Sequence, residues 1–150
     1  MRILPRLPLI LLSASLIGCA GQMPSDLGTV KGSELRDCPD KPNCIQTYDQ
    51  LDTSHFQLPL RFKQDEEQTK IAIMSAIKET GGAIISETAL SPTGYYLHAV
   101  YESDWLKFVD DVEVVITDGL IHIRSASRLG TSDFGVNAER FDKIKAAYAK

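Results

Sequence analysis

The sequence predicts an α+β domain, in which a curved antiparallel sheet of about five strands carries two helices on one face. Short runs of alternating apolar and polar residues are joined by turn-forming residues, which is typical of antiparallel strands. Two other segments, residues 65–80 and 138–148, carry apolar residues at helical spacing. The predicted order is therefore β-α-β-β-β-β-α, and the second face of the sheet is expected to be partly open.

The first residues are predicted to be a lipoprotein signal peptide. Arg2 and Arg6 precede an apolar run of about a dozen residues, which is too short to span a bilayer as a helix. The run ends in Leu16-Ile17-Gly18-Cys19, which resembles the lipobox of bacterial lipoproteins. The resemblance implies that residues 1–18 are removed and that Cys19 carries a lipid and an acyl chain such as palmitate. A secreted protein with a chance cysteine here, or an uncleaved anchor, is the alternative.

The residue after the cysteine bears on localisation. Ala20, rather than an aspartate, follows Cys19. By resemblance to the sorting rules of double-membraned bacteria, this implies the periplasmic face of the outer membrane. Because the lipobox implies a lipid on Cys19, the expected partner is the lipid bilayer, which the protein contacts through acylated Cys19.

Residues 19–37 are predicted to be a flexible tether between the lipid and a single domain, residues 38–150. The segment holds three glycines, two serines, one proline and few large apolar residues, so it cannot bury enough surface to order itself. Loss of Arg2 and Arg6 leaves 14 basic residues against 20 acidic ones, a net charge of −6. Such an acidic chain is not expected to bind nucleic acid.

Cys38 and Cys44 are predicted to form a disulfide. Export places them in an oxidising compartment, and they are the two cysteines that remain once Cys19 is lipidated. A metal site is the alternative, but His55, His98 and His122 are scattered and none lies at ligand spacing. No metal and no cofactor are predicted.

The first strand and the first helix have clear signals. Alternation over residues 56–62 predicts a strand, and Pro59 favours a sheet edge for it. Asp65 is the expected N-cap of the helix, which has acidic residues in its first turn. Its buried stripe is expected to be Ile73, Met74 and Ile77, and the helix is expected to end at Gly81-Gly82.

Four more strands are predicted at residues 83–87, 95–103, 111–117 and 120–127, with a turn at residues 91–94. Asp118-Gly119 is typical of a type I′ hairpin turn, and this turn sets the register of the last two strands. Val115 should then face His122, and Glu113 should face Arg124, on the face opposite the Val/Ile core. Glu113 and Arg124 are expected to form a cross-strand ion pair, which contributes little to stability if it is exposed, and a general acid or base role for Glu113 is the alternative.

The segment Trp105-Leu106-Lys107-Phe108 interrupts the strand pattern, and it is expected to form a corner that fills the core. A docking bulge is the alternative. The last helix is predicted to begin after Asn137 as its N-cap and to bury three residues, Phe141, Ile144 and Tyr148.

The densest polar stretch, residues 124–137, joins the last strand to the last helix. Guanidinium groups, hydroxyls and free backbone N–H groups favour a carboxylate or a phosphate. The candidate ligand-binding residues are His122, Arg124, Ser125, Ser127, Arg128, Ser132, Asp133, Asn137 and Arg140. The sequence favours, over this binding role, a connection held by its own side chains, with Asp133 paired with Arg128 or Arg140 and the serines bonded to the backbone.

Three motifs resemble a known family. They are Cys38-Pro-x-x-Pro-Asn-Cys44, Phe108-Val-Asp-Asp-Val-Glu113 and Arg124-Ser-x-Ser-Arg-x-Gly-x-Ser-Asp-Phe-Gly-x-Asn-x-x-Arg140. Together they are similar to the domain-of-unknown-function family 1499, from Cys38 almost to the C-terminus. The resemblance implies an exported or membrane-associated domain with a cysteine pair, and it transfers no catalytic residue.

The sequence therefore favours a non-enzymatic, membrane-tethered module of the cell envelope that binds a small anionic ligand or an envelope partner. One alternative is a hydrolase or phosphate-handling enzyme that uses loop 124–137, with Ser127 or Ser132 acting beside His122 or Asp133. Another is a lipoprotein that docks on a protein through an apolar patch around Tyr96, Val100 and Trp105.

Overall fold

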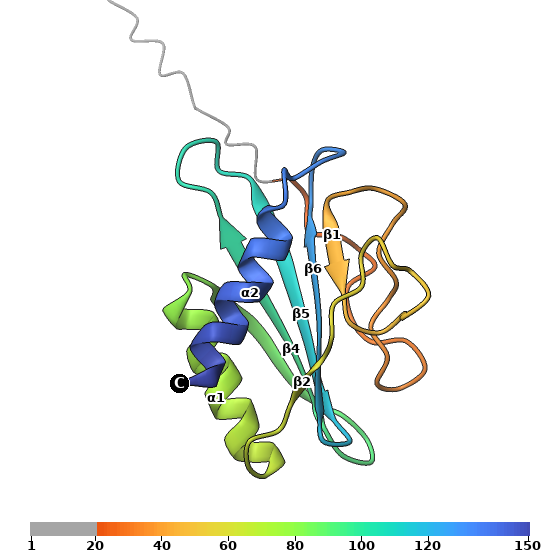
Figure 1. Ribbon diagram of the computed structural model, residues 1–150, viewed down its shortest axis with the longest axis vertical. Coiled ribbons are helices and arrows are strands. Elements are labelled where there is room, and N and C mark those ends of the chain that lie inside the picture. The colour runs from red at the N-terminus through yellow and green to blue at the C-terminus, as the bar shows by residue number, and fades with distance from the viewer. Residues whose placement is uncertain (1–20) are drawn as a thin grey trace, which may run out of the picture.

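The structure is a computed structural model, and it describes residues 21–150. The predicted signal peptide and Cys19 lie outside the described residues. Six antiparallel strands form one open sheet, and both helices cover the same face (Figure 1). This arrangement confirms the predicted α+β class. The elements are β1 (Cys44–Gln46), β2 (Leu60–Arg61), α1 (Glu66–Glu79), β3 (Ala83–Ala89), β4 (Tyr95–Glu102), β5 (Val109–Thr117), β6 (Leu120–Ser127) and α2 (Val136–Ala149).

The strands lie in the order β1-β6-β5-β4-β3, and β2 also pairs with β6. The β5–β6 register confirms the hairpin prediction, because Val115 pairs with His122 and Glu113 with Arg124. Asp118 and Gly119 both have positive φ, at 50° and 78°, as a type I′ turn requires.

The core lies between the sheet and the two helices. Every second residue of β5 and β6 points toward the helices, and the largest of these side chains are fully buried. They are Val112, Val114, Ile116, Ile121 and Ile123. From the helices, Ile73, Ile77, Phe141, Ile144 and Tyr148 pack against them, as predicted.

An aspartate side chain binds backbone N–H groups at the start of each helix, but only the first of these aspartates was predicted. Asp65 Oδ1 accepts a hydrogen bond from the Gln68 N–H at 2.8 Å and caps α1. The prediction of Asn137 as the cap of α2 is wrong, because the helix begins at Val136 and Asn137 lies inside its first turn. The first N–H groups of α2 are instead bound by Asp133, which accepts from Gly135 at 3.0 Å and Asn137 at 2.7 Å.

The predicted strand over residues 56–62 is shorter in the structure. Only Leu60 and Arg61 pair with β6, since Pro59 has no N–H to donate to a ladder. Upstream of it, Phe56 forms an isolated bridge with Gln46. β1 was not predicted, because three residues are too few to show an alternation.

The second face of the sheet is covered over β5 and part of β4, whereas Ser86 and Thr88 of β3 are exposed, so this face is partly open as predicted. Leu35 is buried and packs with Tyr96 and Val115 on the face opposite the helices. The Gly28 N–H donates to Glu113 at 2.7 Å. The structure thus differs from the expected tether over residues 28–35, which pack as part of the domain.

The segment Trp105–Phe108 connects β4 to β5 and does not fill the core. Trp105 is 94% exposed, so the prediction of a core-filling corner is wrong. Among residues 21–150, no helix has the length and apolar character needed to cross a membrane.

Candidate functional site

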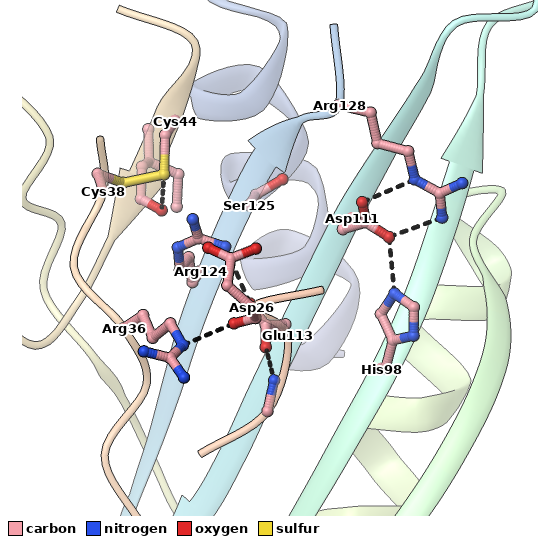
Figure 2. A network of polar contacts seen from close by, with 12 residues as sticks. Asp26, Arg36, Cys38, Cys44, His98, Asp111, Glu113, Arg124, Ser125 and Arg128 are labelled. Carbon is pink, nitrogen blue, oxygen red and sulfur yellow. Dashed lines mark hydrogen bonds and ion pairs between the residues drawn. A yellow bond between two sulfur atoms is a disulfide. The ribbon is translucent and has the colours of Figure 1, made fainter. Parts of the chain in front are cut away.

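Two consecutive aspartates on β5 place carboxylates on both faces of the sheet, because successive side chains of a strand point to opposite faces. Asp110 lies on the helix side, where it accepts a hydrogen bond from Arg140 Nη2 at 2.5 Å. Asp111 lies on the other side, where Arg128 donates to both of its oxygens at 2.8 Å (Figure 2). One strand therefore holds two ion pairs that the sheet separates.

On the face away from the helices, Asp111 has a second partner. His98 Nε2 lies 2.7 Å from Asp111 Oδ1, and both side chains are buried. Burial acts to raise the pKa of Asp111, but the hydrogen bonds from Arg128 and His98 hold that pKa below its usual value.

Glu113 lies beside this cluster and is 1% exposed. It accepts a hydrogen bond from Arg124 Nη1 at 2.9 Å (Figure 2). The Tyr96 hydroxyl donates to it at 2.9 Å and the Gly28 N–H at 2.7 Å. The predicted cross-strand ion pair is thus present, and both of its side chains are buried. Burial and the charge of Glu113 raise the pKa of the Tyr96 hydroxyl.

His122 lies on this same face. Its ring stacks on that of Tyr48 with centroids 4.0 Å apart, and Nδ1 lies 3.3 Å from Thr47 Oγ1. Burial lowers the pKa of His122 below its usual value. The imidazole therefore contributes to packing near the edge of the sheet.

On the helix side, Asn137 joins the end of β6 to α2. Its Oδ1 accepts hydrogen bonds from Ser125 Oγ and Arg140 Nη1, each at 2.5 Å. Its Nδ2 donates to the Asn43 carbonyl at 3.0 Å and to Ser127 Oγ at 3.1 Å. These contacts satisfy the amide of a residue with no exposed surface.

Asp133 binds the start of α2 and not an arginine. It accepts from two backbone N–H groups and from Asn137 Nδ2 at 2.8 Å. Burial acts to raise its pKa, but these hydrogen bonds hold the pKa of Asp133 below its usual value. The predicted pairing of Asp133 with Arg128 or Arg140 is wrong, because those arginines bind Asp111 and Asp110.

The structure divides the candidate residues between the two faces. Ser125, Ser127, Asp133, Asn137 and Arg140 lie on the helix side, and His122, Arg124 and Arg128 lie on the other. Ser132 is exposed and accepts from the Phe134 N–H at 3.3 Å. Each of the three arginines is already bound to a carboxylate, so none presents an unpaired guanidinium to an anion.

The geometry required by the hydrolase hypothesis is absent from residues 21–150. Ser127 Oγ contacts Asn137, while His122 lies on the other side of the sheet. Ser132 Oγ contacts the backbone of Phe134. In this part of the chain, neither serine forms the hydrogen bond to His122 or Asp133 that would activate a nucleophile.

A pocket of about 610 Å³ opens on the helix side, next to the Asp110–Arg140 pair. It lies between the start of α2, the end of α1 and two connections, residues 103–108 and 128–135. Apolar side chains from the two connections and from α2 form much of its wall. They are Leu106, Phe108, Leu129, Phe134 and Val136.

The charges around the pocket are mixed, with an excess of acid. Four carboxylates line it, and two cations, Arg140 and Lys143, do so. Lys143 pairs with Glu139 at 2.7 Å, and Arg140 is held by Asp110. The pocket therefore favours a neutral or zwitterionic ligand over an anion.

The predicted disulfide is present in the structure. It joins Cys38 and Cys44, with Cα atoms 5.7 Å apart (Figure 2). Among residues 21–150, no group of three or more His, Cys, Asp or Glu side chains is placed to hold a metal ion.

The sequence did not identify Asp110, Asp111 and His98 as site residues. The pattern that could have found them is the adjacent pair Asp110-Asp111 inside an apolar strand, since alternation puts one carboxylate on each face. The pocket was also missed, although Phe108 and Phe134 are large apolar residues in polar connecting segments.

Comparisons with known proteins give one match. A family model described as a protein of unknown function (DUF1499) matches residues 34–147. No curated protein and no solved structure matches the chain.

Proposed function

The chain belongs to the DUF1499 family, whose function is unknown, and we propose that it is a non-enzymatic binding module of the cell envelope. In this proposal a lipid on Cys19 tethers it to the membrane. Its ligand is an amphipathic molecule whose apolar part enters the pocket beside α2.

The observation that carries the proposal is the pocket itself. Its volume of about 610 Å³ lies within the ~300–1,000 Å³ range of small-molecule sites. Apolar walls above a buried ion pair are suited to a ligand with an apolar body and a small polar end. The hydrogen bonds of Asn137 fix Arg140 in place, so the floor of the pocket is preformed.

The charges narrow the class of ligand. The sequence favoured a small anion, but that expectation relied on free arginines, and Arg124, Arg128 and Arg140 are each bound by a carboxylate. A neutral or zwitterionic amphiphile avoids repulsion by Glu102, Asp133 and Glu139 around the pocket. The contacts of Ser127 and Ser132 give the hydrolase alternative no support.

Calorimetric titration with a zwitterionic monoacyl phospholipid, kept below its micelle concentration, tests the proposal. Val136 lines the pocket and is 44% exposed, so Val136→Trp should fill the opening and weaken binding about tenfold or more, since a lost apolar contact of ~1.5 kcal/mol is worth that factor. Ile85→Trp, at an exposed position of β3 outside the pocket, is the matched control and should bind as the unmodified chain does. Equal binding by both variants, or no binding by the unmodified chain, would contradict the proposal.

A further inference from the structure

We propose that the rim of this pocket is a membrane-docking surface, so that the pocket opens into the bilayer and takes its ligand from the lipid. The rim consists of Trp105, Leu106, Phe108, Leu129 and Phe134. The inference rests on the proposed function, which places a lipid on Cys19. It adds that the ligand comes from the bilayer and that the domain is oriented with its pocket toward the membrane.

The first support is a cluster of exposed apolar side chains on two connections. Phe134 is 97% exposed and Trp105 is 94% exposed, while Leu106, Phe108 and Leu129 are each at least 41% exposed. Single exposed apolar residues are ordinary, but a group at one site marks an interaction surface. Both connections lie at the same end of the sheet, at the top of the view in Figure 1. The Leu106, Phe108, Leu129 and Phe134 side chains also line the one pocket.

The second support is the position of Gly21, the first residue that the structure describes. A side-chain carbon added to Gly21 would lie 3.1 Å from Leu129 Cγ and 3.2 Å from Arg128 Cβ, so the backbone of Gly21 lies against the rim. Two residues extend at most about 7 Å, and Cys19 is two residues before Gly21. A lipid on Cys19 would therefore enter the membrane next to Leu129. This proximity is the reason to assign the bilayer, rather than a protein, as the occupant of the rim.

The charges near the rim define how it would bind. Lys107 pairs with Glu102 at 3.0 Å, Arg128 is bound by Asp111, and Asp104 adds a further acidic residue. Without an excess of basic residues, docking depends on apolar insertion and not on anionic headgroups. Aromatic side chains such as Trp105 are well suited to the boundary between water and lipid.

Trp105 is the only tryptophan of the chain, so its fluorescence reports on the rim alone. The experiment uses the full chain, expressed in a bacterium that processes lipoproteins and reconstituted into phosphatidylcholine vesicles with brominated acyl chains. The expected result is an emission maximum shifted to shorter wavelength, loss of emission on brominated lipid, and protection from aqueous iodide. Neither added anionic lipid nor salt should increase the loss of emission.

The matched control moves the tryptophan to the other end of the sheet. Leu58 is 73% exposed and lies two residues before β2, which pairs with the first residues of β6. In the double variant Trp105→Phe/Leu58→Trp, the tryptophan should stay accessible to iodide and should not respond to brominated lipid.

Two results would overturn the inference. If iodide quenches Trp105 as it does the control, the rim is in water. If Trp105 is protected from iodide but insensitive to brominated lipid, a second copy or another protein covers the rim. Because the titration of Val136→Trp measures binding to the pocket in solution, the two proposals can fail separately. If only docking fails, Trp105 does not respond to brominated lipid but the titration still shows weaker binding by Val136→Trp. If the proposed function fails, the titration itself shows no binding or no effect of the variant.

Discussion

At the scale of single residues, Asp111 shows how this sheet keeps a charge buried. The carboxylate is 2% exposed, and the guanidinium of Arg128 binds both of its oxygens. His98 adds a third hydrogen bond, at 2.7 Å. Removal of one partner of such a buried pair leaves the other charge uncompensated, which costs far more than loss of a surface ion pair.

The lowered pKa of Asp111 makes the stability of the domain depend on pH. The unfolded carboxyl, with a pKa of about 3.9, binds a proton before the folded one does. Stability from this group is thus fully present above about pH 5 and is lost as pH falls through 3.9 toward the folded pKa. Urea unfolding from pH 7 to pH 2.5 should show this loss of free energy.

The Asp111→Asn variant isolates that contribution. It should lower the free energy of unfolding by about 3 kcal/mol at pH 7, because Arg128 loses its counter-charge, and it should flatten the decline below about pH 4. The control is Asp142→Asn, at an exposed position of α2, which should keep the decline. If the free energy of unfolding of Asp111→Asn falls with pH as much as that of the unmodified chain, other carboxylates cause the pH dependence.

At the scale of elements, β1 depends on contacts that lie beyond its own sequence. It is three residues long, and Cys44 pairs with Ala126 of β6. The carbonyl of Asn43, the residue before β1, accepts hydrogen bonds from the Ser127 N–H and from Asn137 Nδ2. The disulfide to Cys38 closes the loop that leads into this strand.

Loss of the disulfide should destabilise the domain modestly. The bond closes a loop with a sequence separation of 6, for which the chain-entropy model gives about 2 kcal/mol. Reduction with a phosphine should lower the free energy of unfolding by that amount, as measured in urea. Cys38→Ala/Cys44→Ala should match the reduced chain and should not respond to the phosphine. A change in both chains would indicate an effect of the reagent itself.

The elements differ in how far local sequence determines them. Helix α1 and the β5–β6 hairpin could be predicted because their signals, the Asp65 cap and the Asp118-Gly119 turn, act within a few residues. The start of α2 could not be predicted, since Asp133 and Asn137 are both residue types that cap helices. The burial of Asn137 against β6 makes Asp133 the residue that binds the first N–H groups.

At the scale of the whole molecule, the segment before the family match contributes to the fold. Glu113 accepts from the Gly28 N–H, and the Tyr48 hydroxyl donates to the Ser33 carbonyl at 2.7 Å. Leu35, near the start of the match, is 3% exposed. The composition of this segment indicated a tether, because composition does not show that a single residue, Leu35, packs against Tyr96.

Leu35→Ala tests whether this segment stabilises the domain. Loss of a buried leucine side chain should lower the free energy of unfolding by about 2–3 kcal/mol. Leu51→Ala, at a position 91% exposed, should change it by less than about 0.5 kcal/mol. Urea unfolding measures both, and equal effects would mean that residues 28–35 do not pack stably on the sheet.

The polar residues of the site could be named from the sequence, but their grouping could not. Arg124 and Arg128 precede Arg140 along one stretch, so they resemble parts of a single site. Strand alternation and the path of α2 send Arg140 to the opposite face, toward Asp110. Whether an arginine is free to bind a ligand depends on whether the fold places a carboxylate of the protein beside it. The tertiary structure, and not the local sequence, determines this.

The contact of Gly21 with Leu129 has a consequence for how such a protein meets other molecules. With a lipid on Cys19, almost no spacer would separate the domain from the bilayer, so its reach into the aqueous compartment would be that of the domain alone. Encounters at the pocket would then be confined to two dimensions and governed by lateral diffusion. The abundance of a ligand within the membrane, and not its concentration in solution, would determine how often the pocket is filled.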